Sequence, residues 1–260
     1  MGKCTYRNIL GEFMVSFFAM TPLSAPSPKS NGAKIDRAER TTYVTPDSVV
    51  LVGTFVPATK VRAPAVLLLH QLGRARATYE AFLQPLRDAG FASLSLDFRG
   101  HGDSTKVGDK DISWEDFSEN DWQGINTDVA TALAGLRKQR GVDPENIAVV
   151  GASIGANTAL VTASGDPGIK SVVLLSPGLD YRGIKTEAAG AGLAQRSVMI
   201  VAAENDSYSF ESSKKLAQVV EKSVFVQEKG EAHGTDMLVA NPALLTQIID
   251  FLSKSLTPSP

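Results

Sequence analysis

Apolar residues along this chain follow two spacings that alternate from about residue 49 to the C-terminus. Short, almost continuous apolar runs are typical of strands buried on both faces. They occupy 65–69, 91–96, 146–150, 171–175, 197–203 and 223–227. Between them, apolar residues recur at helical spacing, as at Tyr79, Phe82, Leu83 and Leu86, which fall at i, i+3, i+4 and i+7. The pattern predicts strands separated by amphipathic helices.

This alternation predicts an α/β fold with a mainly parallel sheet covered by helices on both sides. Residues 49–56 are rich in β-formers and are expected to belong to an opening antiparallel pair. The last helical stripe runs through 244–252. In such sheets the functional site lies at the carboxyl ends of the strands, so the residues that follow each strand are the candidates for chemistry.

The first forty residues differ from the rest and are expected to form an N-terminal extension, with a single domain over residues 41–260. Lys3 and Arg7 precede a short apolar run at 13–20, and small residues follow up to Ala25. The segment resembles a secretory signal peptide cleaved after Ala25. That interpretation predicts a secreted or periplasmic protein, and the alternative, a disordered extension and linker, predicts a cytoplasmic one.

Composition narrows the classes of partner. The 260 residues carry a formal net charge of −2, and 43% are hydrophobic. Without a long basic run, nucleic acid is not an expected partner, and the apolar run at 13–20 is too short for stable membrane insertion. The single cysteine, Cys4, excludes an intramolecular disulfide and a cysteine-rich metal site. The oligomeric state is left open.

The strongest chemical motif is Gly151-Ala152-Ser153-Ile154-Gly155, which links a buried strand to a helical segment. A G-x-S-x-G sequence in a strand–turn–helix context is typical of a nucleophile elbow. The serine occupies a tight, strained turn, and bulky side chains two positions to either side would collide with neighbouring backbone. A nucleotide-binding turn would need a third glycine or a Lys-Ser/Thr ending, and Ala156-Asn157 supplies neither. Ser153 is therefore the candidate nucleophile.

A serine hydroxyl needs a base, and among the three histidines only His233 follows Ser153 in the chain. Asp206 follows the strand at 197–203 and is the first candidate for the acid that orients the imidazole. Glu204 and Asp180 are the competing candidates, and Asp206 could instead act as a helix N-cap.

Two backbone amides are expected to form an oxyanion hole: that of Ile154 and that of Leu72 in the loop after the first long parallel strand, with Gln71 as the alternative to Leu72. His70 is expected to brace this loop. In the segment 97–104, Asp97 and Arg99 are expected to pair with each other and His101 to pack in a turn. No metal site is expected, because further ligands at suitable spacing are absent.

The segments 67–73, 97–104 and 151–155, followed by Asp206 and His233, resemble the α/β-hydrolase superfamily in order and spacing, and the resemblance extends from residue 49 to the C-terminus. Among its members the chain looks like small dienelactone hydrolases and esterases. The resemblance implies one domain with an eight-stranded type of sheet. Two departures stand out: Gln71 replaces a glycine that many relatives carry after the histidine, and Ser153 replaces the cysteine nucleophile of dienelactone hydrolases proper.

The resemblance implies a serine esterase that acts on small or soluble acyl substrates without a cofactor. Only about twenty residues, 177–196, separate two strands where lid-bearing relatives insert a large cap, so a minimal cap is expected. Tyr181, Tyr208 and Met237 are candidate substrate-binding residues, with Ile184 a further wall. A peptidase or amidase of the same fold and a non-catalytic ligand-binding homologue remain as alternatives.

Overall fold

The computed structural model describes residues 37–193 and 196–256, so the expected signal peptide lies outside the described residues. Within this part of the chain, eight strands have five or more residues and form the body of one sheet. They are β1 (Glu39–Val44), β2 (Val49–Val56), β3 (Ala63–Leu69), β4 (Ala92–Leu96), β7 (Val142–Ala152), β8 (Ile169–Leu175), β11 (Ser197–Ala203) and β12 (Val224–Glu228).

The sheet is mainly parallel, as the alternation of strands and helices predicts. Its order is β12-β11-β8-β7-β3-β4-β2, and every neighbouring pair from β12 to β4 is parallel. The β2 strand runs antiparallel to both β4 and β1, which confirms the predicted antiparallel pair. The two-residue strands β5 (Lys106–Val107) and β6 (Lys110–Asp111) extend the sheet beyond β2.

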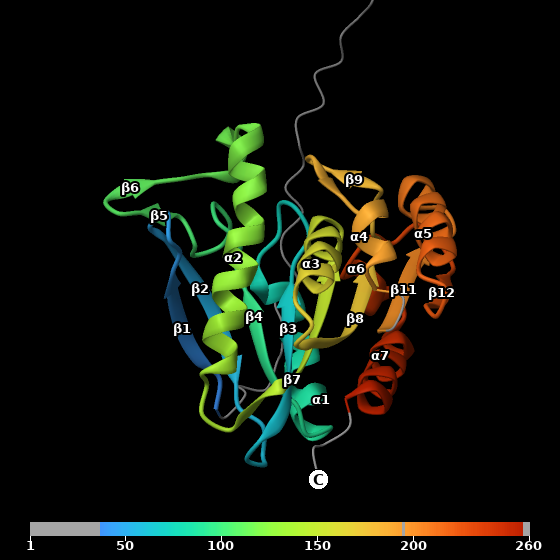
Figure 1. Cartoon of the computed structure of the whole chain (residues 1–260), viewed down its shortest axis with the longest axis horizontal. Coiled ribbons are helices and arrows are strands. Elements are labelled where there is room, and N and C mark those ends of the chain that lie inside the picture. The colour runs from blue at the N-terminus through green and yellow to red at the C-terminus, as the bar shows by residue number, and fades with distance from the viewer. Residues whose placement is uncertain (1–36, 194–195, 257–260) are drawn as a thin grey trace, which may run out of the picture. The chain divides into compact units, whose positions relative to one another are not determined.

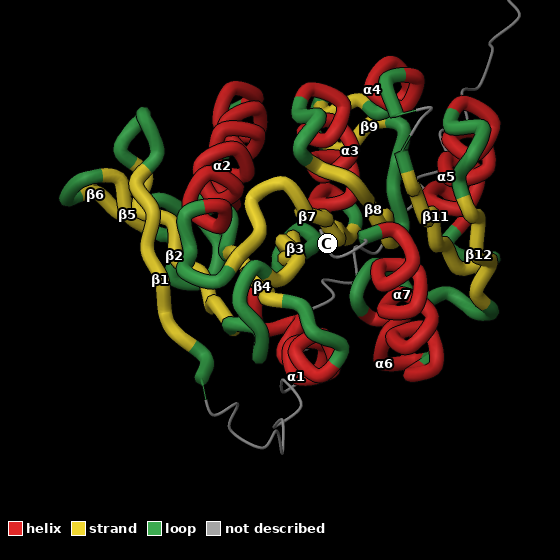
Figure 2. Tube along the Cα trace, turned by 60° about the horizontal axis from the view of Figure 1, so that its bottom comes forward, coloured by secondary structure: helices red, strands yellow, loops and turns green. Residues whose placement is uncertain are grey.

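Helices cover both faces of the sheet, as Figures 1 and 2 show. One layer holds α2 (Glu119–Arg137), α3 (Ile154–Gly165), α4 (Glu187–Ala191) and α5 (Ser207–Val219). The opposite layer holds α1 (Glu80–Asp88), α6 (Asp236–Ala240) and α7 (Pro242–Ser255). Each layer packs on the sheet through its own hydrophobic cluster. The β3 residues from Ala65 to Leu69 are fully buried, which explains their unbroken apolar run.

Local sequence sets where the long helices begin. Ser118 and Asp121 form a reciprocal capping box at the start of α2, so two backbone N–H groups that the helix itself cannot satisfy have partners. In α7 the first residue is Pro242, which has no N–H to leave unpaired, and the Asn241 side chain accepts a hydrogen bond from the Ala243 amide. These caps fix the ends of helices whose apolar stripes already specify the buried face.

The segment between β8 and β11 is a minimal cap, as its length predicts. It contains a hairpin of β9 (Asp180–Tyr181) and β10 (Ile184–Lys185), followed by the one-turn helix α4. The hairpin is tied to the first turn of α5, because the Tyr208 hydroxyl accepts a bond from the Asp180 amide at 3.0 Å and donates to the Asp180 carbonyl at 2.9 Å. Sequence patterns missed these elements because each strand has only two residues.

One expected ion pair is wrong. Asp97 does not pair with Arg99: it binds the Arg76 guanidinium and accepts hydrogen bonds from the amides of Arg76 and Asp103. Arg99 turns to the other side, where it contacts Asp128 and Asp47, each at 2.7 Å. Two residues that follow the same strand thus have different partners: Asp97 binds Arg76 before α1, whereas Arg99 binds Asp128 of α2.

Candidate active site

Ser153 occupies a strained turn between β7 and α3. Its backbone has φ 53° and ψ −118°, a conformation that residues with a Cβ rarely adopt. A Cβ on Gly151 would lie 2.1 Å from the Gly155 carbonyl oxygen, and one on Gly155 would lie 2.5 Å from the Leu69 carbonyl oxygen. Both glycines are therefore required by contacts with backbone atoms, which the G-x-S-x-G pattern predicts. The Ser153 amide donates to the Leu175 carbonyl at 2.8 Å and anchors the turn to β8.

His233 and Asp206 meet at the carboxyl edge of the sheet. The distance between His233 Nδ1 and Asp206 Oδ2 is 2.6 Å. An ionised carboxylate only accepts hydrogen bonds, so Nδ1 carries the proton and Nε2 is the nitrogen left with a free lone pair. Burial raises the pKa of Asp206, but hydrogen bonds from His233 and Ser209 outweigh it and hold that pKa below its usual range. This arrangement suits an acid that orients an imidazole base.

The competing acids lie elsewhere. Asp180 accepts a hydrogen bond from the Gly183 amide at 2.8 Å and so closes the β9–β10 hairpin. Glu204 is exposed, and its amide pairs with the Glu228 carbonyl at 2.9 Å. Asp206 does stand at the N-cap position of α5, but its side chain makes no capping bond. The structure thus brings Asp206, and neither rival, to His233.

Tyr181 links the surroundings of Ser153 to those of His233. Its hydroxyl lies 3.0 Å from Ser209 Oγ and interacts with the Ser153 hydroxyl, and its ring stands edge-on to His233 with the centroids 6.4 Å apart. Burial raises the pKa of Tyr181, so its hydroxyl stays protonated near neutral pH. Tyr208 packs against the Tyr181 ring at 5.5 Å. Of the three predicted substrate-binding residues, Tyr181 therefore lies beside the candidate nucleophile and base, and Tyr208 packs against Tyr181.

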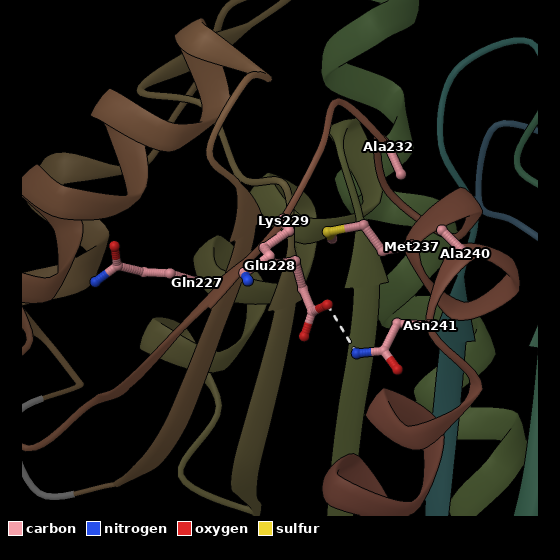
Figure 3. A pocket seen from close by; sticks show the side chains of 7 residues that line it. All are labelled: Gln227, Glu228, Lys229, Ala232, Met237, Ala240 and Asn241. Carbon is pink, nitrogen blue, oxygen red and sulfur yellow. Dashed lines mark hydrogen bonds between the residues drawn. The ribbon is translucent and has the colours of Figure 1, made fainter.

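Met237 is not brought into this group. It is 1% exposed and packs with the cluster under α7. Its side chain lines a separate groove of about 400 Å³, shown in Figure 3, together with Gln227, Glu228, Lys229, Ala232, Ala240 and Asn241. Across this groove the Glu228 carboxylate accepts a hydrogen bond from the Asn241 amide at 2.8 Å. Ile184, the further wall, is also buried in the core.

His70 fixes the peptide that carries the predicted oxyanion donor, and its expected bracing role is confirmed. The Phe98 amide donates to Nε2 at 3.1 Å, so the proton is on Nδ1, which donates to the Gln71 carbonyl at 2.8 Å. In a planar trans peptide the Leu72 N–H points opposite to that carbonyl. Burial, helped by the neighbouring His101, lowers the pKa of His70 to about 3, so the brace is neutral at ordinary pH.

The second predicted donor, the Ile154 amide, belongs to the first residue of α3 and has no partner within the helix. Beyond the oxyanion loop, His101 is 2% exposed and stacks on Trp114 with the centroids 5.4 Å apart. This confirms its expected role as a packed turn residue. Among the described residues no group of three His, Cys, Asp or Glu side chains is arranged to hold a metal ion, and no helix is long and apolar enough to cross a membrane.

Three polar residues of the site have roles that sequence reasoning missed. Ser176 Oγ accepts a hydrogen bond from the Gly234 amide at 2.9 Å, next to His233. Ser209 lies between the Tyr181 hydroxyl and the imidazole, 3.4 Å from His233 Nδ1. The Gln71 side chain reaches the histidine loop as well. Ser176 follows β8 directly and Gln71 lies two residues after β3, so the rule that chemistry follows strand ends points to both positions; Ser209, inside α5, carries no such signal.

Comparisons with known proteins match this chain to a family model and to a curated relative. The family model for serine aminopeptidases of type S33 matches residues 60–244. A quorum-quenching protein, AidA, of Acinetobacter baumannii is 29% identical over 125 residues, which is 48% of this chain and 38% of that protein. The match therefore spans well under half the length of this curated relative.

Two solved structures share the fold at low identity. The Pyrococcus furiosus esterase has a TM-score of 0.70 and 16% identity over 85% of this chain and 93% of its own. A dienelactone hydrolase from Anabaena variabilis has a TM-score of 0.66 and 16% identity, covering 85% of this chain and 99% of its own. The family match covers most of the chain, and the solved structures share its fold. The chain belongs to the serine aminopeptidase S33 family of α/β hydrolases and is a serine α/β hydrolase.

Proposed function

We propose that this protein hydrolyses carboxylic esters of small or soluble acyl groups, with Ser153 as nucleophile, His233 as general base and Asp206 as the orienting acid. The observation that carries the proposal is the 2.6 Å contact between His233 Nδ1 and Asp206, together with Tyr181, which contacts both His233 and the Ser153 hydroxyl of the strained elbow. That contact leaves Nε2 as the basic nitrogen, which is what activation of a serine hydroxyl requires.

The proposed reaction proceeds through an acyl-enzyme. Nε2 of His233 takes the proton of Ser153 as Oγ forms a bond to the ester carbonyl carbon, and the Leu72 and Ile154 amides stabilise the oxyanion. Collapse of this intermediate breaks the ester C–O bond, and the alcohol leaves with the proton from His233. Water then attacks the acyl-enzyme and gives a proton to His233. When the bond between the acyl carbon and Oγ breaks, His233 returns that proton to Ser153 Oγ and the acid is released.

Two observations favour small or soluble substrates. The segment between β8 and β11 contains a hairpin of two-residue strands and a short helix rather than a large lid. His233 has a side chain that is 36% exposed, so water reaches the base directly. The esterase and dienelactone hydrolase folds cited above support ester chemistry at the level of architecture.

Peptide or amide hydrolysis is the second candidate, because the matching family model describes serine aminopeptidases. A series of p-nitrophenyl esters from acetate to octanoate, compared with the matching p-nitroanilides, separates the two. We expect ester turnover that is highest for short chains, and a loss of at least about 10³-fold in Ser153→Ala. Faster anilide turnover, or ester turnover that survives in Ser153→Ala, would contradict the proposal.

The third alternative is a non-catalytic binding protein. A fluorophosphonate probe reacts with an activated serine, so we expect labelling of the wild type at Ser153 and none in Ser153→Ala. A folded wild-type protein that does not label would favour the binding alternative. A quorum-sensing reporter strain would test separately whether the activity for which the Acinetobacter relative is named extends to this chain.

A further inference from the structure

Gln71 joins two loops that are 162 residues apart in sequence. It lies in the loop after β3, directly before Leu72, yet its side chain ends at the histidine loop. Oε1 accepts hydrogen bonds from the Thr235 hydroxyl at 2.7 Å and the Thr235 amide at 3.1 Å, while Nε2 donates to the His233 carbonyl at 3.3 Å. Gln71 is only 5% exposed, so these bonds form away from bulk solvent.

The histidine loop has little regular structure of its own. It follows the edge strand β12 and contains two glycines with positive φ, Gly230 at 89° and Gly234 at 59°. A Cβ on Gly234 would lie 2.9 Å from Gln71 Oε1, so the glycine allows the amide to pack against the loop. Gln71 and Ser176 together bind three successive residues, 233–235, by their backbone.

The main chain of Gln71 is held just as firmly on the opposite side. Its carbonyl oxygen accepts from His70 Nδ1 at 2.8 Å and from the Arg74 amide at 3.2 Å. These bonds fix the peptide between Gln71 and Leu72, and hence the direction of the Leu72 N–H. The main chain of Gln71 therefore belongs to the peptide that presents the Leu72 amide, and its side chain binds the loop that contains His233.

We propose that Gln71 is a positioning residue that sets the His233 imidazole relative to the Leu72 amide. The inference rests on the proposed function of Ser153 and His233. Its physical basis is that proton transfer tolerates little misplacement: a shift of about 1 Å can cost about 100-fold in rate. Loss of the Gln71 amide removes one hydrogen bond to the His233 carbonyl, which keeps the bond from the Asp236 amide at 3.1 Å, and removes the acceptor of the Thr235 amide, so the loop is held less firmly.

Gln71→Met tests the proposal, since methionine has a similar volume and cannot make these hydrogen bonds. We expect kcat on p-nitrophenyl acetate to fall about 100-fold with KM within about 3-fold of wild type, because the reacting geometry is altered more than the binding surface. The rate of fluorophosphonate labelling should fall in parallel. Gln71→Glu keeps the acceptor for Thr235 and lacks the donor to His233, so an intermediate kcat is expected. Its added negative charge near the imidazole should move the acid limb of the pH–rate profile to higher pH.

Arg74→Ala is the matched control. Arg74 links the same two loops through an exposed contact with Asp236 at 3.3 Å, with both side chains about half exposed. Breaking this pair should leave kcat within about 2-fold, because exposed ion pairs contribute little. Thermal unfolding of all three variants shows whether each is folded at the assay temperature.

Two results would overturn the proposal. One is a folded Gln71→Met with kcat and labelling rate within 3-fold of wild type. The other is a loss of activity that follows the unfolded fraction, with an unchanged pH–rate profile in Gln71→Glu. If the wild-type protein reacts with the fluorophosphonate probe but hydrolyses no ester, only the ester proposal is contradicted. The labelling rates of the variants then still test the role of Gln71. A wild type that neither turns over ester nor labels overturns both.

Discussion

The Ser153 elbow and the His233 loop hold their side chains by different means. At the elbow, backbone contacts decide: Gly151 and Gly155 leave no room for a Cβ, and Ser153 is forced to φ 53°. At the histidine loop, the carbonyls of residues 233–235 accept hydrogen bonds from the first turn of α6, and the side chains of Gln71 and Ser176 supply further bonds to the same backbone. The elbow is therefore specified by a local motif, whereas the loop depends on residues far away in the chain.

The largest effect is expected from Asp206→Asn, which changes the side chain that contacts His233 Nδ1 but keeps nearly the same size and shape. An amide in place of the carboxylate allows the wrong imidazole tautomer, and we expect kcat to fall by about 10³ to 10⁴-fold. Asp236→Asn, an exposed acid of the same region, serves as the control and should change kcat less than about 2-fold. Comparable activity in Asp206→Asn and wild type would remove Asp206 from the mechanism.

Alanine at two glycines compares the regions directly. Gly155→Ala should cost about 3 kcal/mol or more in the free energy of unfolding, because its Cβ meets the backbone oxygens of Leu69 and His70, which cannot move aside. Gly230→Ala in the histidine loop meets no atom within 4 Å, so only its φ of 89° opposes the change, at about 1 kcal/mol. Urea unfolding measures both. Equal costs would show that the elbow is not the more sterically restricted region.

His70, in the loop that packs against the elbow, should make the free energy of unfolding depend on pH. His70 has a pKa of about 3 when folded against an ordinary 6.5, because burial disfavours its charged form. Below pH 6.5 the unfolded chain binds a proton that the folded protein does not, so stability falls as pH falls toward 3. Burial also lowers the pKa of His101 and acts in the same direction.

For His70 alone, the free energy of unfolding should drop by about 2 kcal/mol roughly from pH 7.5 to pH 5. Urea unfolding at these two values measures the drop. A flat profile would mean that His70 is protonated without cost in the folded protein, and the brace on the Gln71 carbonyl would then need another explanation.

Sequence alone predicts the elements and the elbow because both are local. The apolar run from Ala65 to Leu69 specifies a strand buried on two faces, and the glycines around Ser153 lie within five residues of one another. Asp206 could be proposed because it follows a strand, and His233 because it lies in the last loop; the fold brings such positions to one edge of the sheet.

Interactions that join distant segments could not be predicted in this way. Gln71 departs from the glycine that many α/β hydrolases have at this place, and nothing nearby in sequence indicates that its amide reaches Thr235. Sequence proximity predicts Asp97 as the partner of Arg99, whereas Asp128 becomes close only when α2 packs on the sheet. Tertiary packing sets the direction of a side chain, and the pattern and spacing of residues in the sequence do not determine it.

The double hydrogen bond between Tyr208 and Asp180 has a consequence for enlarging the cap by design. It connects the hairpin directly to the first turn of α5, which follows Asp206. A graft that lengthens the hairpin between Tyr181 and Ile184 preserves that coupling, because the anchor at Asp180 stays in place. A graft that displaces the main chain at residue 180 removes both bonds to Tyr208 and weakens the contact between the cap and the helix that bears the acid, so a broader substrate range would then come with a looser catalytic centre.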